Sequence, residues 1–228
     1  LLGVVGESGS GKTTAAEMAA EILGDAGATR PVFVAPSRSD LIGKFVGQTA
    51  PKVKEAFERA RGGVLFVDEA GFFLNRHSGG YVDEAIKEFV RYMELYPDVT
   101  VIFAMYTNEV ADFLKMDEGL RSRVSRVVKF EDYSVPELLA ITDYMFREKG
   151  YTRTGGEKAL KEYFETERHK EGFGNARAVR KLVESVILSV SLARVSKEDS
   201  GNAAAEWQLD GDSMEIPEYL VKQGIRRL

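Results

Sequence analysis

The segment Gly6–Thr13, with the sequence GESGSGKT, decides the expected fold of the first half of this chain. It follows the apolar run Leu1–Val5 and leads into Lys12–Leu23, where Ala, Met, Ile and Leu recur at helical spacing. This order predicts a strand, a tight loop and a helix. In that setting the pattern GxxxxGK[ST] is typical of a phosphate-binding loop, because its backbone N–H groups and the helix N-terminus attract anionic oxygens. A Gly/Ser turn that binds nothing is the alternative.

The phosphate ligand of this loop is expected to be ATP or ADP with Mg²⁺. Lys12 supplies a positive charge to the phosphates, and the hydroxyl of Thr13 offers an oxygen to Mg²⁺, which needs few protein ligands. The residues predicted to contact the nucleotide are Gly6, Glu7, Ser8, Gly9, Ser10, Gly11, Lys12, Thr13 and Thr14.

A second acidic motif follows the apolar run Val64–Val67, which ends in Asp68 and Glu69. Because ligands of parallel α/β folds bind at the carboxyl ends of the strands, Asp68 is expected to hold Mg²⁺ through a water molecule. Glu69 is expected to orient and deprotonate the attacking water. The alternative is a strand that ends in two solvated acids.

Strands and helices alternate over the first 130 residues, which predicts an α/β fold with a parallel five-stranded sheet sandwiched by helices. The expected strands are Leu1–Val5, Pro31–Ala35, Val64–Val67, Val99–Met105 and Val127–Phe130. The expected helices are Lys12–Leu23, Val53–Arg61 and Val82–Leu95.

Helical patterns dominate after Ser134, a candidate N-cap with Glu137 three positions later. We expect a small helical lid with helices near Val135–Lys149, Glu157–Lys170 and Asn175–Ser196, and no buried strand between them. The predicted domains are 1–132 and 133–228. For the tail we expect a loop at Ser200–Ala205, a short strand at Trp207–Leu209 and a helix from Pro217.

Composition excludes several classes of protein. The chain has 228 residues, no cysteine and a formal charge of −5, and its two histidines, His77 and His169, are far apart. A thiol nucleophile is therefore excluded, and a disulfide scaffold or a His-rich zinc site is not expected. No apolar run reaches the ~20 residues of a membrane span, so the cytoplasm is the expected compartment. The acidic charge also argues against nucleic acid as a partner.

Taken together, the motifs resemble those of an AAA+ ATPase. The phosphate loop and Asp68-Glu69 are followed by Gly119–Arg123 and by Gly174–Arg177, whose sequence is GNAR. Ser39–Leu41, Phe45–Ala50, Val101–Ala104 and Gly119–Arg123 more narrowly resemble the CbxX/CfqX family, which includes red-type Rubisco activases, the stage V sporulation protein K group and ATPases of type VII secretion.

This resemblance implies a hexameric ring with active sites between subunits. Thr107 matches sensor 1, although Asn108 is adjacent and is the residue type often found there. Arg123 matches the arginine finger, with Arg121 as the second candidate, and Arg177 matches sensor 2. The alternative for these arginines is a solvated surface cluster or a nucleic-acid patch.

The segment Phe45-Val46-Gly47 resembles the pore loop of AAA+ machines that thread polypeptides. An exposed aromatic residue beside an aliphatic one grips a peptide through apolar contact, without regard to sequence. The alternative is that Phe45 is a core residue of its loop.

The chain departs from the family pattern in two places. Glu7-Ser8 stands where the family usually has Asn-Pro, a feature shared with ABC transporter ATPases, but the chain has no LSGGQ-like segment. The sequence starts at the expected first strand, so the helical segment that precedes this strand in AAA+ domains is expected to be missing from it, and contacts to the adenine base are expected to be weak or lost.

The expected function is therefore ATP hydrolysis in a ring, coupled to remodelling of a protein client, with a Rubisco activase as one specific case. A nucleotide-gated assembly scaffold, of the sporulation or type VII secretion kind, is the rival hypothesis. A DNA-directed ATPase such as a clamp loader is disfavoured by the net charge of −5.

Overall fold

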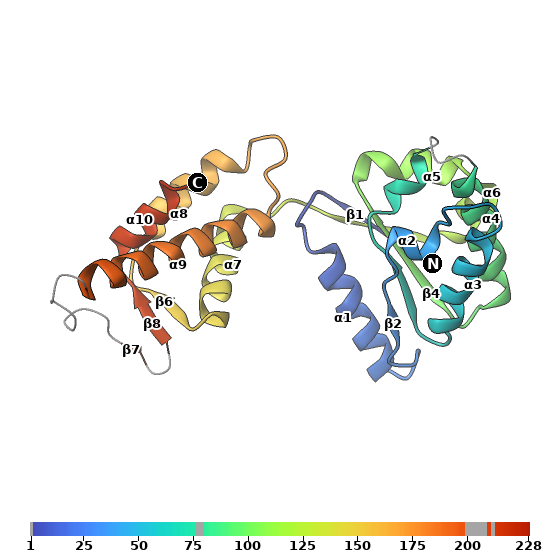
Figure 1. Cartoon of the computed structure of the whole chain (residues 1–228), viewed down its shortest axis with the longest axis horizontal. Helices are drawn as coiled ribbons and strands as arrows, with labels where there is room; N and C mark the ends of the chain where they lie inside the picture. Colours follow the sequence, from blue (N-terminus) through green and yellow to red (C-terminus); the bar gives the residue numbers. More distant parts are fainter. Residues whose placement is uncertain (1, 76–79, 199–208, 211–212) are drawn as a thin grey trace. The chain divides into compact units, whose positions relative to one another are not determined.

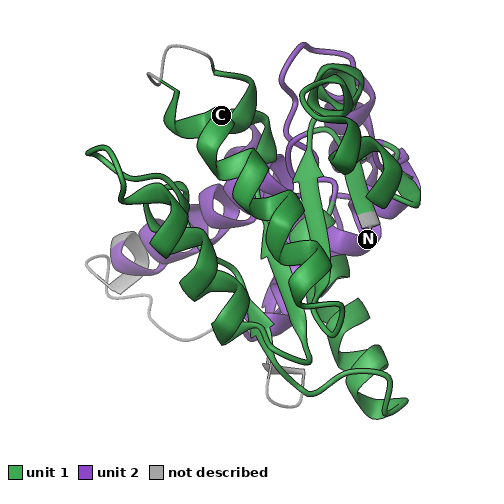
Figure 2. Ribbon diagram, turned by 90° about the vertical axis from the view of Figure 1, so that its right-hand side faces the viewer, with its two compact units in different colours: residues 1–7, 11–131 green, residues 8–10, 132–228 purple. Residues whose placement is uncertain are grey.

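The structure is a computed structural model that describes residues 2–75, 80–198, 209–210 and 213–228. It divides into two compact units, coloured separately in Figure 2. The first unit holds residues 1–7 and 11–131, and the second holds residues 8–10 and 132–228. His77 and the expected loop at Ser200–Ala205 lie outside the described residues.

The first unit is built on a sheet of five parallel strands, as expected (Figure 1). In chain order the strands are β1 (Leu2–Gly6), β2 (Phe33–Val34), β3 (Val64–Val67), β4 (Thr100–Met105) and β5 (Arg126–Phe130). They are arranged in the order β2-β3-β4-β1-β5. Because all strands are parallel, their carboxyl ends share one edge of the sheet, and the loops after β1, β3 and β4 meet there.

Helices cover both faces of this sheet. The helix α1 (Lys12–Asp25) packs through Ala16 and Ala20 against Val4, Phe66 and Ile102 on one face. The other face carries a larger core, to which Leu65 and Val67 point from β3. The remaining helices of the unit are α2 (Arg38–Leu41), α3 (Thr49–Arg59), η1 (Ala70–Leu74), α4 (Tyr81–Leu95), η3 (Thr107–Glu109), α5 (Val110–Lys115) and α6 (Glu118–Arg123).

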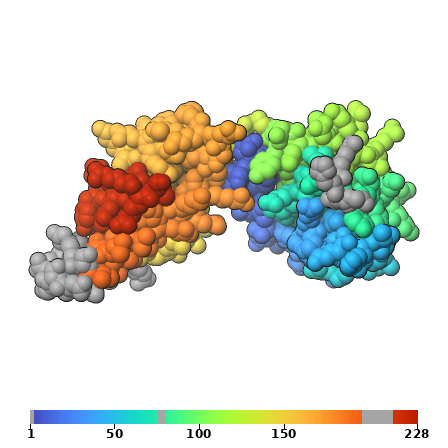
Figure 3. All heavy atoms as spheres, turned by 45° about the horizontal axis from the view of Figure 1, so that its top comes forward, coloured from blue at the N-terminus to red at the C-terminus, as the bar shows by residue number. Residues whose placement is uncertain are grey.

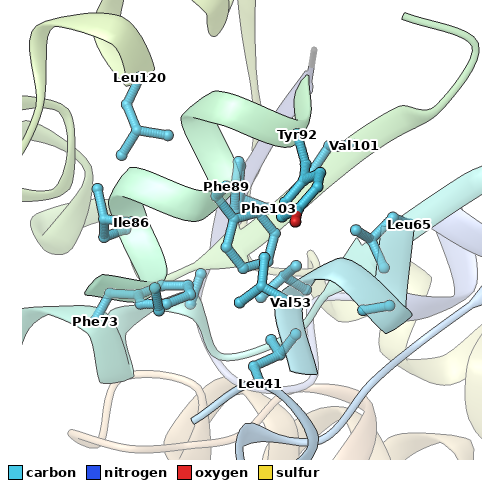
Figure 4. Close-up of a cluster of buried hydrophobic side chains, with 14 of the residues drawn as sticks. Leu41, Val53, Leu65, Phe73, Ile86, Phe89, Tyr92, Val101, Phe103 and Leu120 are labelled. Carbon is cyan, nitrogen blue, oxygen red and sulfur yellow. The ribbon is translucent and has the colours of Figure 1, made fainter. Parts of the chain in front are cut away.

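The larger core is rich in phenylalanine (Figure 4). The ring of Phe89, from α4, lies 5.7 Å from that of Phe103 on β4 and 5.6 Å from that of Phe73 on η1. Tilted and edge-to-face pairs of this kind add attraction beyond the burial of apolar area. The cluster fixes α4 and η1 against the strand ends that carry the candidate site.

The second unit is mainly helical. Its helices are α7 (Val135–Glu148), α8 (Glu157–Glu167), α9 (Ala176–Glu198) and α10 (Glu218–Ile225). In Figure 3 the atoms of α10, in red, lie against those of α9, in orange. The approach is close because Gly224 is buried beside Val186, where an added Cβ would be 2.4 Å from a Val186 methyl group.

A short strand that is not among the elements expected from the sequence lies between α7 and α8, and it is half-buried, so the expectation of no buried strand there is not contradicted. The second unit contains a three-stranded sheet of order β6-β8-β7, with β6 (Tyr151–Arg153), β7 (Leu209–Asp210) and β8 (Ser213–Ile216). Three half-buried residues in β6 are too few to show a periodic pattern, and their partners in β8 come about sixty positions later. Trp207, expected to begin a strand, lies outside the described residues.

Other elements agree with the sequence within a few residues. The strand at Val64–Val67 is confirmed at both ends, and the terminal helix follows Pro217 as expected. The strand expected over Pro31–Ala35 is shortened to Phe33–Val34, and α3 begins one turn earlier than expected, at Thr49. Within the described residues no helix is long and apolar enough to span a bilayer.

Candidate phosphate-binding site

Lys12 lies at the first turn of α1, and its side chain turns back over the preceding loop. Its ammonium donates hydrogen bonds to the carbonyl oxygens of Gly6, at 2.8 Å, and Glu7, at 2.9 Å. The turn into α1 requires Gly11, whose φ of 92° is in the left-handed region that favours glycine. Lys12 is therefore held at the mouth of the loop, where a phosphate would need its charge.

Thr13, from the phosphate-loop motif, and Asp68, from the acidic motif after β3, are in contact. The Thr13 hydroxyl donates to Asp68 Oδ2 at 3.1 Å, and both residues are exposed. Asp68 directly follows β3, and Thr13 follows the loop after β1, so the shared edge of the sheet brings these two oxygens together. The pair predicted to hold Mg²⁺ is thus adjacent in the structure.

Glu69 has an unusual backbone conformation. Its φ is 50° and its ψ 37°, the left-handed region that residues other than glycine rarely adopt, and its N–H donates to Asp68 Oδ1 at 2.8 Å. A left-handed non-glycine residue costs roughly 1–2 kcal/mol. Such strain is typical of functional sites, where the surroundings hold a side chain in a demanding position.

The residues after β4 form a short turn beside Lys12. The carboxylate of Glu109 accepts a hydrogen bond from Tyr106 N–H at 2.9 Å, which starts the 3-10 helix holding Thr107 and Asn108. Both of these candidate sensor residues are exposed. The ring of Tyr106 lies 5.5 Å from the Lys12 ammonium.

The tip of the loop, Ser8–Ser10, belongs to the second unit and is bonded within it. Arg177 Nη1 donates to Ser8 Oγ at 2.6 Å. This hydrogen bond joins the loop tip to the GNAR segment through the hydroxyl of Ser8. An added Cβ on Gly9 would be 2.2 Å from the Gly174 carbonyl oxygen, so only glycine fits there.

The candidate arginine finger is paired inside the first unit. Arg123 Nη2 bonds to Glu94 Oε2 at 3.0 Å and Nη1 bonds to the Gly119 carbonyl at 3.2 Å. The structure therefore does not bring Arg123 to Lys12 or Asp68. Arg121, the second candidate, is exposed on α6.

The loop with Phe45-Val46-Gly47 projects from between α2 and α3. Phe45 is 68% exposed and Val46 is 86% exposed, so the alternative that Phe45 is a core residue is wrong. The side chain of Gln48 accepts hydrogen bonds from the N–H groups of Lys44 and Phe45, at 3.2 and 3.3 Å. The loop is thus braced at its base while its apolar residues remain open to solvent.

The oxygens at this site suit Mg²⁺ better than a softer metal. Thr13 and Asp68 supply hard oxygen donors, and Mg²⁺ takes its other ligands from waters and phosphates. Within the described part of the chain no group of three or more His, Asp or Glu side chains could hold a metal by itself.

Three contacts at the site were not expected from the sequence. Asn175 and Tyr133 contact Ser8–Ser10, and Tyr106 lies over Lys12. Asn175 is within the GNAR segment, in which only Arg177 was assigned a role. Asn175 has a left-handed backbone, with a φ of 46°. The only hint of this conformation in the sequence is that the residue is an asparagine.

Comparisons with known proteins agree with this fold. Residues 2–132 match the family described as ATPase family associated with various cellular activities (AAA), and residues 134–216 match the AAA lid domain. A crystal structure of the FIGL-1 AAA domain in complex with ADP aligns over 99% of this chain and 70% of its own, with a TM-score of 0.61 and 16% identity. At that identity the likeness concerns the fold alone.

The curated relatives lie in a narrower group. Protein CbbX of Cereibacter sphaeroides is 39% identical over 184 residues, which is 78% of this chain and 59% of that protein. Protein CfxQ of Xanthobacter flavus is 38% identical over 192 residues, or 82% of this chain and 60% of that protein. The chloroplastic ribulose bisphosphate carboxylase/oxygenase activase of Cyanidioschyzon merolae is 38% identical, over 78% of this chain and 62% of that protein.

The chain therefore spans about 60% of the length of these relatives. Its family match covers residues 2–132, more than half of the chain, and is continued by the match to the lid. This chain belongs to the AAA family of ATPases, and its sequence groups it with the CbxX/CfqX proteins of that family.

Proposed function

We propose that this chain binds ATP or ADP with Mg²⁺ and hydrolyses ATP as a subunit of a hexameric ring in the cytoplasm. The observation that carries the proposal is the meeting of Thr13 and Asp68 at 3.1 Å, beside a Lys12 held at the mouth of a phosphate-loop sequence. The phosphate-loop motif and the acidic motif after β3 thus place a positive charge beside hard oxygen donors. A nucleoside triphosphate with Mg²⁺ needs this combination for binding.

Each residue of this arrangement has a distinct task. Lys12 places its positive charge against the phosphate oxygens, and the loop N–H groups add further donors. Thr13 and Asp68 would hold Mg²⁺, which neutralises phosphate charge when bound. Glu69, held in a strained backbone next to Asp68, orients a water molecule and accepts its proton.

The remaining candidate residues act on the transferring phosphoryl group. We propose Thr107 as sensor 1 and Arg177 as sensor 2. The exposure of both side chains supports these roles, because each needs access to a ligand. Arg123 is proposed to act on the site of a neighbouring subunit, since inside its own chain it is bonded to Glu94.

We further propose that hydrolysis drives the remodelling of a protein client. The exposed, braced loop at Phe45 supports this step, because an aromatic side chain in solvent on a fixed base is suited to gripping a polypeptide. The relative named as an activase makes ribulose bisphosphate carboxylase/oxygenase the first client to test.

The change Phe45→Ala separates a threading machine from a nucleotide-gated scaffold. We expect the variant to bind and hydrolyse ATP normally while ATP-dependent reactivation of inhibited ribulose bisphosphate carboxylase/oxygenase falls. Its melting temperature should stay close to the parental value, because 68% of Phe45 is already in solvent. As a matched control, Phe57→Ala removes a fully buried ring and should cost about 3–5 kcal/mol.

Reactivation by Phe45→Ala at the parental rate, with ATP turnover intact, would remove the threading proposal and leave the gated scaffold. Reactivation that survives Lys12→Ala would show that nucleotide is not needed, and would remove the coupling of hydrolysis to the client.

A further inference from the structure

Three consecutive carbonyl groups at the tip of the phosphate loop are each bonded by a donor of the second unit. The Ser8 carbonyl accepts from Asn175 Nδ2 at 3.3 Å, and the Gly9 carbonyl from Ala176 N–H at 3.2 Å. The Ser10 carbonyl accepts from the Tyr133 hydroxyl at 3.2 Å. All three donors come from residues 132–228, which form one compact unit with the tip.

The direction of these carbonyls determines the direction of the following N–H groups. In a trans peptide the C=O and N–H bonds point to opposite sides, and no peptide bond of the described chain is cis. Tying the carbonyls of Ser8–Ser10 therefore turns the N–H groups of Gly9, Ser10 and Gly11 away from these donors. Within the described residues those N–H groups have no hydrogen-bond acceptor.

Asn175 is the centre of this arrangement. It is 1% exposed, its Oδ1 accepts from Tyr133 N–H at 3.0 Å, and its Nδ2 also donates to Asp132 Oδ1 at 2.7 Å. One side chain thus links the loop tip to the segment that leads into α7. It does so from a left-handed backbone, which asparagine tolerates better than most residues.

A second observation shows that the tip is prepared for a ligand. Ser10 is 1% exposed, and its hydroxyl has no hydrogen-bond partner among the described residues. Buried polar groups are almost always bonded, so an unpartnered hydroxyl next to three free N–H groups is costly without a ligand or water. Successive backbone N–H groups of this kind form anion-binding concavities.

We propose that Asn175 and Tyr133 are positioning residues for nucleotide binding: they hold the carbonyls of Ser8 and Ser10 so that the N–H groups of Gly9–Gly11 face the nucleotide phosphates. The proposal rests on the proposed function, because it names residues that prepare the same site. Neither side chain touches the nucleotide. The effect of each is on the loop geometry, and hence on affinity for the phosphates.

The test measures ADP and AMP affinity by calorimetry with Asn175→Gly and Tyr133→Phe. Glycine accepts the φ of 46°, so the first change removes the amide without adding backbone strain. We expect Asn175→Gly to weaken ADP binding about tenfold and Tyr133→Phe by a smaller factor, as suits the loss of one to three hydrogen bonds. AMP, which lacks the β-phosphate, should lose much less affinity than ADP.

A control variant and a second measurement distinguish a specific change in the loop from a general loss of stability of the second unit. Thr142→Val removes another buried hydrogen bond of the second unit, from Thr142 Oγ1 to the Leu138 carbonyl at 2.7 Å, far from the loop in sequence. It should lower stability without changing ADP affinity. Amide hydrogen exchange of residues 7–12, measured without nucleotide, should speed up in Asn175→Gly and stay at the parental rate in Thr142→Val.

Parental exchange rates and parental ADP affinity in both loop variants would overturn the proposal. An equal loss of ADP and AMP affinity would also overturn it, because the effect would then not be on the phosphates. If the unaltered chain binds no ADP, the proposed function fails, and the exchange of residues 7–12 still decides whether Asn175 orders the loop.

Discussion

Gly9 combines a left-handed backbone with a close approach to another segment of the chain. Its φ is 71°, and an added Cβ would be 2.2 Å from the Gly174 carbonyl oxygen. Gly27 has a similar φ of 68° but nothing within 4 Å of such a Cβ, which makes it a matched control. An alanine at either position would have the same left-handed backbone strain, but only at Gly9 would its Cβ also clash with another part of the chain.

We expect Gly27→Ala to cost about 1–2 kcal/mol, the ordinary penalty of a left-handed alanine. Gly9→Ala should cost clearly more and should also weaken ADP binding, because Gly9 and Gly174 must separate. Urea unfolding and ADP titration measure the two effects. Equal destabilisation by the two changes would contradict the close approach of the loop tip to Gly174.

The meeting of the candidate phosphate-site residues could be predicted because their motifs are local. Lys12 and Thr13 stand at a fixed spacing from Gly6, and Asp68 stands at the end of a strand that is buried on both faces. The contacts of Asn175 and Tyr133 with the loop tip could not be predicted, because they span 167 and 123 positions of the sequence. Only the folded chain shows such pairings.

The start of α7 is a capping box that the sequence predicts correctly. The Glu137 carboxylate accepts from both the N–H and the hydroxyl of Ser134, at 2.7 and 2.6 Å. These hydrogen bonds lower the pKa of Glu137 below its ordinary value of 4.5. Ser134→Ala should cost about 1 kcal/mol at neutral pH.

The pH dependence of this effect has a definite sign. A carboxyl whose folded pKa is lowered adds stability above its unfolded pKa, and that stability is lost as the pH falls through the folded value. The difference in the free energy of unfolding between the parental chain and Glu137→Gln should therefore be largest near pH 7 and should shrink below about pH 4.5. A difference that grows on acidification would contradict the capping box.

The elements differ in how well their sequences specify them. Strand β3 is buried on both faces, so its four apolar residues stand out from their surroundings. Strand β6 has three half-buried residues and depends on a partner far along the chain, Tyr151 pairing with Met214. Such short, non-local pairing leaves no periodic signal, and for that reason the small sheet of the second unit was missed.

At the scale of the proposed ring, the prediction concerns Arg123. Mixing Arg123→Ala subunits with Glu69→Gln subunits should restore part of the ATP turnover that each variant lacks alone. The physical reason is that some interfaces then pair an intact Glu69 with an intact Arg123 of the neighbour. Arginine fingers supply roughly 10³–10⁵ in rate, so even a minority of repaired interfaces is measurable.

Two controls make the mixing result interpretable. Arg121→Ala in place of Arg123→Ala tests the second candidate arginine. Glu94→Ala removes the ion-pair partner of Arg123, at 3.0 Å, without removing the arginine itself. Absence of recovery in rings shown to contain both subunits would contradict action on the neighbouring site.

The most direct test of the account is a parallel measurement of ATP binding and phosphate release at saturating Mg²⁺ by the parental chain, Lys12→Ala and Glu69→Gln. Lys12→Ala should lose nucleotide binding, because the charge held by the Gly6 and Glu7 carbonyls is gone. Glu69→Gln keeps the shape of the side chain but not its basicity, so it should bind ATP as the parental chain does and release phosphate at least a hundredfold more slowly. Parental phosphate release by a Glu69→Gln protein that binds ATP normally would contradict the central claim.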